Sequence, residues 1–278
     1  MLPEDWFQVK QISDSVLCIE EPLKRLFPDF MTDKTNIYVI YDKYEALILD
    51  TGSGLFSIKE YVEKLLGKRT VVTPLITHNH FDHVGSLNDF PYAFIHDLEV
   101  EKLQKSESLH YIKQDIIERK EEFIHLIPEN FEREVISTEF HRVADGEWLA
   151  IGKKELQIIH LPGHSKGSLG LWYPEENFYF VGDAFQTGYV YADEDPISFL
   201  KSLEKMALFK TNTFFMSAHE KLYLQQKDLE DLIQDFYTLK NQNFNVDSKI
   251  TNKYLNNPLF MGKKFSIILP PINDFIPK

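Results

Sequence analysis

The segment Thr77-His78-Asn79-His80-Phe81-Asp82-His83-Val84-Gly85 places three histidines and an aspartate within six positions. It follows the apolar run Val71 to Ile76, which predicts a buried strand. Since the chain has only 10 histidines among 278 residues, this concentration favours a metal site over a polar loop of solvated histidines. Imidazole and carboxylate ligands suit Zn, Fe or Mn, and the lack of a thiolate nearby disfavours a closed structural zinc site.

The composition is that of a soluble globular protein. With 43% hydrophobic residues the chain can bury a large core, and no run approaches about 18 consecutive apolar residues. The start, Met1 to Trp6, has no basic region followed by an apolar stretch, so we expect an unexported protein without membrane spans. The single cysteine, Cys18, excludes an internal disulfide and agrees with a cytoplasmic location, and its neighbours predict a buried strand position.

The net charge of −13 bears on the partners of the protein. Such a charge repels phosphate backbones, and the Lys and Arg residues are scattered along the chain. We therefore expect a small-molecule substrate and neither a nucleic-acid nor a membrane partner. A homodimer stays open.

The order of predicted elements indicates an α/β fold. Apolar patterns predict strands at residues 7–9, 16–19, 36–40, 46–49, 92–95, 135–140, 155–160, 168–173, 178–181 and 213–216. Helices are predicted at residues 56–66, 198–208 and 225–243. Because each half offers strands and helices, we expect two sheets packed face to face with helices outside.

The domain boundaries follow from the same patterns. Residues 97–130 carry helical periodicity in two stretches, 97–105 and 109–127, and are interpreted as a helical insertion that could form a lid. We expect one domain over residues 1–245, including this insertion. Residues 246–278 are expected to be a C-terminal tail packed on the same domain, with a final strand near Phe265 to Leu269.

Three further candidate ligands each follow a predicted strand: His164, Asp183 and His219. Taken singly, they could be a loop histidine, a helix N-cap or turn former, and a helix C-cap partner. Functional side chains are often carried by loops at strand ends. Taken together, in this order, the three residues favour a metal site that has more ligands than the first segment supplies.

With these residues the chain resembles the metallo-β-lactamase fold superfamily. The resemblance covers residues from about 36 to 220 and rests on Leu47-Ile48-Leu49-Asp50-Thr51-Gly52, the histidine-rich segment, Gly163-His164-Ser165-Lys166-Gly167-Ser168, Gly182-Asp183 and Ala218-His219. It implies a four-layer αβ/βα sandwich with the site along one sheet edge.

The resemblance also implies a dinuclear site, with zinc favoured and Fe or Mn as alternatives. One metal ion would be held by His78, His80 and His164, the other by Asp82, His83 and His219, with Asp183 bridging them. Asp50 would be an outer carboxylate that orients the metal loop. The other histidines are assigned to the surface or to packing, namely His96, His110, His125, His141 and His160.

The chemistry of such a site is hydrolysis. Two divalent ions can share a water, lower its pKa from about 15.7 towards about 7, and polarise a carbonyl or phosphoryl oxygen. The nucleophile is then a metal-bridging hydroxide, consistent with the lack of a Gly-x-Ser-x-Gly motif. Asp82 can also pass a proton to the leaving group. Tyr189 and Tyr191 are candidate hydrogen-bond donors to an oxyanion or leaving group, or else pocket wall or core.

Several branches of the superfamily are disfavoured by particular features. Flavin-linked oxygen reductases have glutamate where this chain has His80, true β-lactamases are exported, and nucleases of the fold append a nucleic-acid-binding element. The stretch Leu161 to Ser168, with Asp50 to Leu55 and a short helix after the Asp183 loop, is most similar to acyl-CoA thioesterases. We predict hydrolysis of a thioester or ester resembling acyl-CoA or a glutathione thioester. A lactonase, a mononuclear iron persulfide dioxygenase and a non-catalytic sensor are the alternatives.

Overall fold

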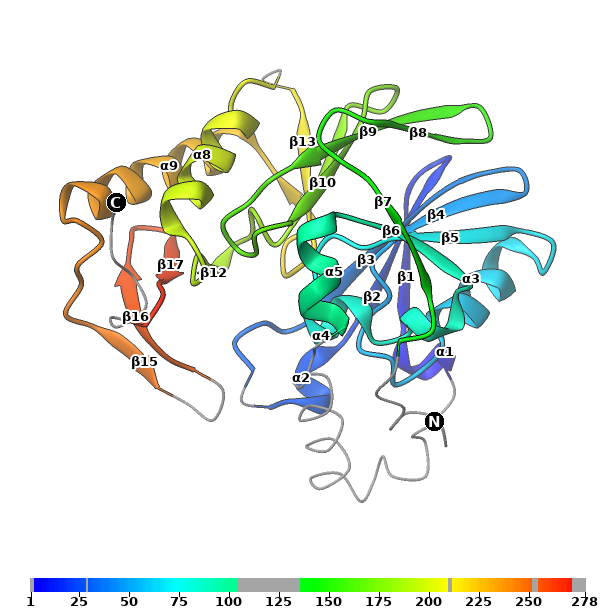
Figure 1. The fold of residues 1–278 in the computed structure, drawn as a ribbon, viewed down its shortest axis with the longest axis horizontal. Helices are drawn as coiled ribbons and strands as arrows, with labels where there is room; N and C mark the ends of the chain where they lie inside the picture. The colour runs from blue at the N-terminus through cyan, green and yellow to red at the C-terminus, as the bar shows by residue number, and fades with distance from the viewer. Residues whose placement is uncertain (1–2, 29, 105–135, 210–211, 252–254, 272–278) are drawn as a thin grey trace.

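The amino-terminal part of the chain forms a seven-stranded sheet whose strand order follows the chain order (Figure 1). The computed structural model describes residues 3–28, 30–104, 136–209, 212–251 and 255–271. The first four strands pair antiparallel and the following pairs are parallel. The strands are β1 Gln8–Ser13, β2 Val16–Glu21, β3 Thr35–Asp42, β4 Glu45–Leu49, β5 Val71–Leu75, β6 Tyr92–Ile95 and β7 Glu139–Arg142.

Helices on this half connect the parallel strands, as a parallel pair requires a crossover. The helix α3, Ile58–Leu66, joins β4 to β5. It begins two residues later than expected because the Ser57 side chain accepts a hydrogen bond from Glu60 N and so caps the helix. The other helical segments here are α1 Pro3–Trp6, α2 Leu23–Leu26, α4 Phe81–Val84, the 3₁₀ turn η1 Leu87–Asp89 and α5 Asp97–Gln104.

The second large sheet has six strands in the order β14-β13-β11-β10-β9-β8. Two helices follow its strands, α8 Pro196–Met206, which is capped by the Asp195 carboxylate, and α9 Gln226–Asn241, which starts with a capping box. The strands are β8 Trp148–Ile151, β9 Lys154–His160, β10 Leu169–Tyr173, β11 Phe178–Gly182, β13 Phe214–Ser217 and β14 Tyr223–Leu224.

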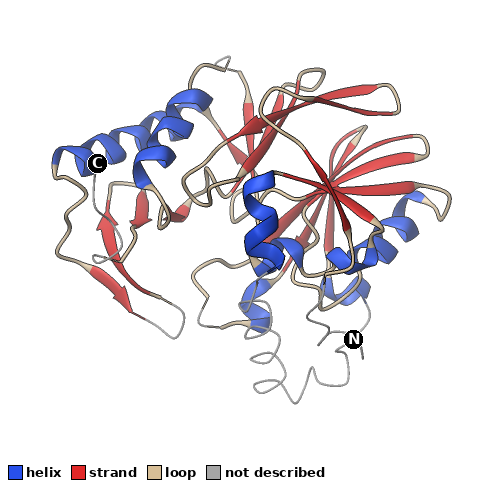
Figure 2. Cartoon of the chain, in the orientation of Figure 1, coloured by secondary structure: helices blue, strands red, loops and turns tan. Residues whose placement is uncertain are grey.

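The buried side chains define four layers. One cluster lies between the two sheets and joins Cys18 and Leu47 of the first to Ile158 and Phe180 of the second. A second cluster packs α3 and α5 on the first sheet, and a third packs α8 and α9 on the second. Helices therefore flank the paired sheets on both outer sides (Figure 2). The four-layer αβ/βα sandwich expected from the resemblance is confirmed, as is the buried strand position of Cys18.

A small third sheet was not expected. It has the order β12-β17-β16-β15, and it joins the segment after Asp183 to the carboxyl-terminal part of the chain. β12 pairs in parallel with β17, from Gly188 opposite Phe265 to Tyr191 opposite Ile268. Only β17 had been predicted. The strands are β12 Gly188–Tyr191, β15 Lys249–Thr251, β16 Asn256–Met261 and β17 Phe265–Ile268.

Two expectations meet the structure only in part. The helix predicted from Asp97 is α5, but the stretch 109–127, and with it most of the helical insertion, lies outside the described residues. The short helix expected after the Asp183 loop is α8, but the strand β12 lies between that loop and the start of the helix at Pro196.

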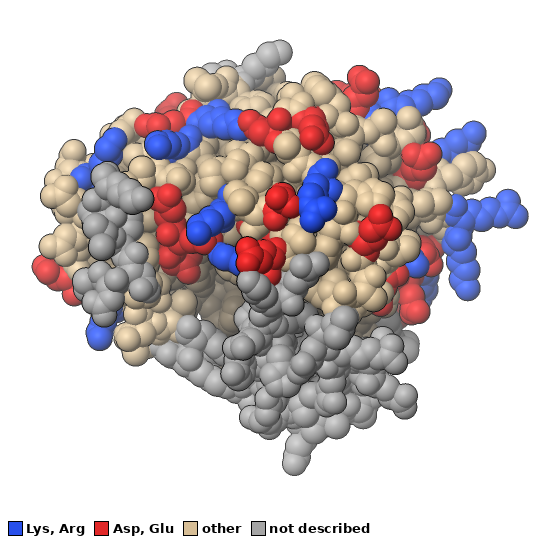
Figure 3. Space-filling model, viewed as in Figure 1, with Lys and Arg blue, Asp and Glu red and all other residues tan. Residues whose placement is uncertain are grey.

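Two further features concern the charged side chains at the surface and the length and polarity of the helices. Acidic and basic side chains are interspersed over the described part of the face in Figure 3. Within the described ranges, every helix is too short or too polar to cross a membrane.

Candidate metal centre

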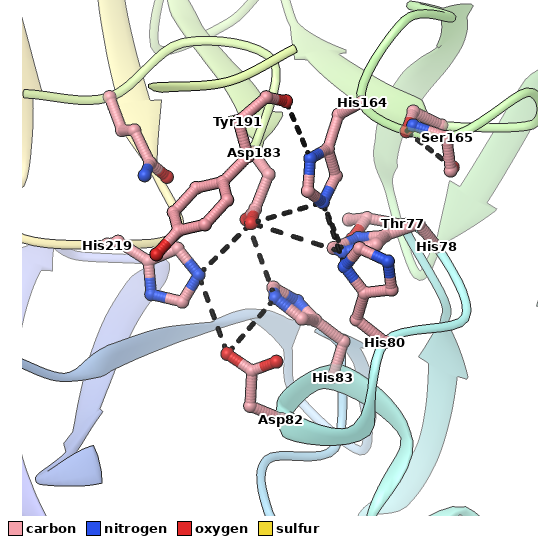
Figure 4. Close-up of polar contacts among 12 residues, drawn as sticks. Thr77, His78, His80, Asp82, His83, His164, Ser165, Asp183, Tyr191 and His219 are labelled. Carbon is pink, nitrogen blue, oxygen red and sulfur yellow. Dashed lines mark hydrogen bonds and ion pairs between the residues drawn. The ribbon is translucent and has the colours of Figure 1, made fainter. Parts of the chain in front are cut away.

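The predicted ligands come together from four loops, each at the end of a strand. The segment Thr77 to Gly85 follows β5, while His164, Asp183 and His219 follow β9, β11 and β13. Figure 4 shows these side chains directed toward one another. Loops held by a rigid scaffold can keep side chains from distant parts of the sequence in a fixed arrangement.

The histidine-rich segment divides its own ligands between two groups. His80 stands at the N-cap position of α4, a single helical turn, and Asp82 and His83 lie inside that turn. The two histidines before or at the start of the turn, His78 and His80, therefore belong to one ligand group. Asp82 and His83, within the turn, belong to the other. Three of these four side chains, those of His78, Asp82 and His83, are buried.

The first group consists of His78, His80 and His164. The Nε2 atom of His164 lies 3.1 Å from Nε2 of His78 and 2.9 Å from Nδ1 of His80. Nitrogens bound to one tetrahedral zinc at about 2.05 Å stand about 3.3 Å apart. The spacing of the three rings fits the ligand set of a single ion.

The second group consists of Asp82, His83 and His219, whose ligand atoms lie within 4.8 Å of one another. Asp82 Oδ2 lies 3.5 Å from Nε2 of both His83 and His219. Asp183 stands between the groups, with Oδ2 3.5 Å from His164 Nε2 and 3.2 Å from His219 Nε2, and Oδ1 3.4 Å from His83 Nε2. This is the position that a bridging carboxylate requires.

Outer groups hold the ring nitrogens that face away from the centre. His164 Nδ1 donates to the backbone oxygen of Tyr191 at 2.9 Å, and His219 Nδ1 donates to that of Lys34 at 2.7 Å. Because a carbonyl oxygen only accepts, each Nδ1 must carry a proton, which leaves Nε2 as the nitrogen that can bind a metal ion. Ligating histidines in metalloproteins are anchored in this way.

Two buried atoms at the centre support the fit of the residues to metal ions. His83 Nε2 and Asp183 Oδ1, which lie 3.4 Å apart, are two of eight buried side-chain atoms of the described residues that have no hydrogen-bond partner. Buried polar atoms are rarely left in that condition, because losing contact with water without a replacement costs about 1–3 kcal/mol. Both atoms face the centre, where a divalent ion would satisfy them.

The pKa values of the histidines differ between the two groups. Burial, together with the neighbouring imidazoles, lowers the pKa of His78 and of His80 well below 6.5. Burial also lowers the pKa of His83, but Asp82, Asp50 and Asp183 outweigh it and raise that pKa to about 10. For His219 the effect of burial is likewise outweighed, chiefly by Asp183, and the pKa rises to about 9. Without a metal ion, His78 and His80 are therefore neutral at pH 7, whereas His83 and His219 carry protons.

Asp50 lies beneath the histidine-rich segment. Its backbone is left-handed, with φ of 67°, and its carboxylate accepts from Thr77 N at 2.7 Å and from Thr77 Oγ1 at 2.8 Å. Its Oδ2 atom lies 2.7 Å from His83 Nδ1. These contacts are the ones that an outer carboxylate orienting the metal loop would make, and that role stays a prediction.

The two tyrosines expected near the site lie on β12, where residues two apart face the same side. The ring of Tyr191 lies beside Asp183 and His219 in Figure 4 and 6.3 Å from the ring of His164. Burial raises the pKa of the Tyr191 phenol, and Asp183 raises it further, so the hydroxyl keeps its proton. Tyr189 is half-buried, and the role of both tyrosines stays a prediction.

Sequence reasoning missed Glu99, a fully buried residue of α5 whose carboxylate contacts two of the ligand loops. It lies in the stretch Asp97-Leu98-Glu99-Val100-Glu101, where acidic residues alternate with apolar ones. Such a pattern on a short helix gives no signal that one of the carboxylates is buried.

Comparison with known proteins identifies the family. The family model of the metallo-beta-lactamase superfamily matches residues 31–219, and the chain belongs to this superfamily. The matched residues contain all seven candidate ligands. The superfamily binds divalent metal ions, in agreement with the His and Asp groups brought together here.

Characterised relatives of the chain are hydrolases. The acyl-coenzyme A thioesterase MBLAC2 of Homo sapiens is 24% identical over 200 residues, covering 66% of this chain and 68% of its own length. The hydroxyacylglutathione hydrolase of Bartonella henselae is 27% identical over 210 residues, covering 72% of this chain and 71% of its own. Among solved structures, a metallo-beta-lactamase family protein from Thermus thermophilus has a TM-score of 0.61 at 20% identity, over 87% of this chain and 86% of that chain. The last likeness concerns the fold alone.

Proposed function

We propose that this protein is a dinuclear metal-dependent hydrolase that cleaves small-molecule thioesters, in the class of acyl-CoA or glutathione thioesters. The observation that carries the proposal is the arrangement of two ligand groups around a central carboxylate, with outer anchors on the imidazoles. The names of the relatives support the substrate class, since they include an acyl-CoA thioesterase and a hydroxyacylglutathione hydrolase.

The residues divide the work of hydrolysis among themselves. His78, His80 and His164 would hold one ion, with Asp82, His83 and His219 on the other and Asp183 between them. Divalent ions, zinc before iron or manganese, lower the pKa of a water and polarise the thioester carbonyl when bound. Water adds to the carbonyl carbon, the carbon–sulfur bond breaks, and the products are a carboxylic acid and a thiol.

Proton transfer and charge stabilisation fall to two other groups near the centre. Asp82 accepts a hydrogen bond from Thr35 Oγ1 at 3.2 Å and faces His83 and His219, so it is placed to take a proton and return it to the leaving thiolate. The Tyr191 hydroxyl, which keeps its proton, is the candidate donor to negative charge that develops on the carbonyl oxygen.

The test is a metal analysis combined with a substrate panel. We expect two divalent ions per chain and hydrolysis of acyl-CoA or S-lactoylglutathione in preference to lactones and simple esters. Metal-replete protein that leaves all thioesters intact would contradict the proposal. One iron per chain with oxygen consumption would instead indicate a persulfide dioxygenase, and preference for lactones would indicate a lactonase.

Metal binding is expected to release about two protons at pH 7 when both ions bind. The protons come from His83 and His219, whose pKa values of about 10 and about 9 keep them protonated without metal, whereas a ligand must offer a free lone pair. As the pH falls below about 9, protons compete more strongly, so the affinity of the second group should fall by up to about 100-fold per pH unit. Calorimetry in buffers of different ionisation enthalpy measures the release.

The first group serves as the internal control for this experiment. Because the pKa values of His78 and His80 are low, binding there should release few protons at pH 7. If both ions bind with the same affinity at pH 6 and pH 8, the assignment of protonated imidazoles to the second group is wrong.

A further inference from the structure

A buried carboxylate outside the ligand set links the two loops that carry the first ligand group. Glu99 has no exposed surface and reaches toward the site from α5. Its Oε2 atom accepts from the backbone N of Asn79 at 3.0 Å and also from the Asn79 side-chain amide. Asn79 stands between His78 and His80, so this oxygen holds the segment that presents both rings.

The other oxygen of Glu99 holds the second loop. Oε1 accepts from Ser165 Oγ at 2.8 Å and from Gly167 N at 2.6 Å. Ser165 follows His164 directly, and its hydroxyl also lies 2.7 Å from Ser168 Oγ, which closes the loop on itself. Each carboxylate oxygen therefore serves one ligand-bearing loop.

The chemistry of the four contacts requires a carboxylate. All four partners are donors, and an ionised carboxylate offers acceptor sites only, about two on each oxygen. A glutamine of the same shape would replace one oxygen with an NH₂ group that donates. Whichever way that amide turned, the backbone N–H of either Asn79 or Gly167 would lose its acceptor and face a like donor instead.

We propose that Glu99 is a positioning residue that fixes the His164 loop against the His78 and His80 segment and so preorganises the first ligand group. This inference rests on the proposed metal-dependent function. Glu99 itself binds no metal here, since its oxygens are taken up by the loops. Outer partners of this kind are worth about 10–100-fold in metal affinity.

The experiment is a titration of the metal-free full-length protein with Co²⁺ against a competing chelator, followed by the visible absorption of the bound ion. We expect Glu99→Gln to bind the first Co²⁺ about 10–100-fold more weakly than the wild type and with an altered spectrum. Two controls separate positioning from a general loss of stability. Glu101→Gln changes an exposed carboxylate on the same helix.

The second control, Glu21→Gln, changes another buried carboxylate. Glu21 accepts from Trp6 Nε1 and from the backbone and hydroxyl of Ser53, none of which stands beside a ligand of the first group. Its loss should lower the melting temperature, but the affinity and spectrum of the first Co²⁺ should stay within about threefold of the wild type. An equal loss of Co²⁺ affinity in Glu21→Gln and Glu99→Gln would overturn the positioning role.

The remaining outcomes also decide the matter. A folded Glu99→Gln protein that binds Co²⁺ like the wild type would sink the inference and leave the proposed function standing. If the wild type binds neither Co²⁺ nor Zn²⁺, the proposed function itself fails. If Glu99→Gln does not fold, Ser165→Ala replaces it, because that variant removes one of the four donors to Glu99, together with the contact between the Ser165 and Ser168 hydroxyls. The Ser165→Ala variant should bind the first Co²⁺ about three- to tenfold more weakly than the wild type. Unchanged affinity would count against the role of Glu99.

Discussion

Replacing Asp183 with alanine is expected to reduce the kcat/KM of thioester hydrolysis by at least about 10³-fold, the equivalent of several kcal/mol of transition-state stabilisation. Asp183 is the carboxylate that faces both ligand groups, 3.5 Å from His164 and 3.2 Å from His219. Its removal leaves the five imidazoles of the two groups without the carboxylate that stands between them. The expected cause is loss of the metal pair, which elemental analysis of the purified variant measures alongside the kinetics.

A matched aspartate far from the site provides the control. Asp231 lies on α9 and forms ion pairs with Lys227 and Lys264 at the surface. Exposed pairs contribute about 0–1 kcal/mol, so Asp231→Ala should keep full activity and both metal ions. An Asp183→Ala protein that retains two ions and more than a tenth of the activity would show that Asp183 is not the bridge.

Replacing Gly85 with alanine is expected to destabilise the protein by about 3 kcal/mol or more and to loosen the second ligand group. Gly85 has φ of −61°, which any residue adopts, so the glycine is needed for space. A Cβ there would collide with the carbonyl group of Ser53 and the backbone N of Gly54. Neither is a flexible side chain, so the backbone itself would have to move.

The hydrogen bonds that this backbone movement would disturb join the turn after Asp50 to α4. Thr51 N donates to His83 O at 2.7 Å, and Gly85 N donates to Gly52 O at 2.7 Å. Thermal unfolding should show a melting temperature lower by roughly 6–12 °C. Gly146→Ala is the control, because Gly146 has φ of +83° but a Cβ there would meet nothing within 4 Å, so only backbone strain of about 1–2 kcal/mol is expected. Equal shifts in both variants would argue against the steric explanation.

The ligands could be predicted from the sequence because they are carried by short motifs. The spacing of His78, His80, Asp82 and His83 belongs to one loop and one helical turn, so its meaning is local. His164, Asp183 and His219 stand out only as polar residues that end apolar strands, and their convergence became an expectation through the family resemblance. The structure brings all of them together, while the metal-binding role of each stays a prediction.

The supporting groups could not be predicted, for a physical reason. The anchors of His164 and His219 are the backbone oxygens of Tyr191 and Lys34, and a backbone oxygen has no signature in a sequence. Glu99 was missed because burial of a carboxylate depends on donors 20 and more residues away. Long-range contacts of this kind become visible only when the tertiary structure is known.

The small third sheet was missed for a similar reason. Gly188-Tyr189-Val190-Tyr191 is a short run that would not persist as a strand alone, and its partner strand begins at Phe265. The strands β15 and β16 lie in an Asn-rich stretch that the sequence pattern predicts to be a packed tail with a single final strand. Pairing across a long sequence separation decides these elements, and local propensity does not report it.

Through its parallel pairing with β12, the carboxyl-terminal strand β17 supports a residue that anchors one of the candidate metal ligands. Among the described residues β12 lies at the edge of its sheet and pairs with β17, and the Tyr191 oxygen that accepts from His164 belongs to β12. The segment common to the family ends at residue 219, far short of β17. The backbone oxygen that anchors His164 is therefore carried by a strand whose pairing partner lies beyond the residues matched by the family model.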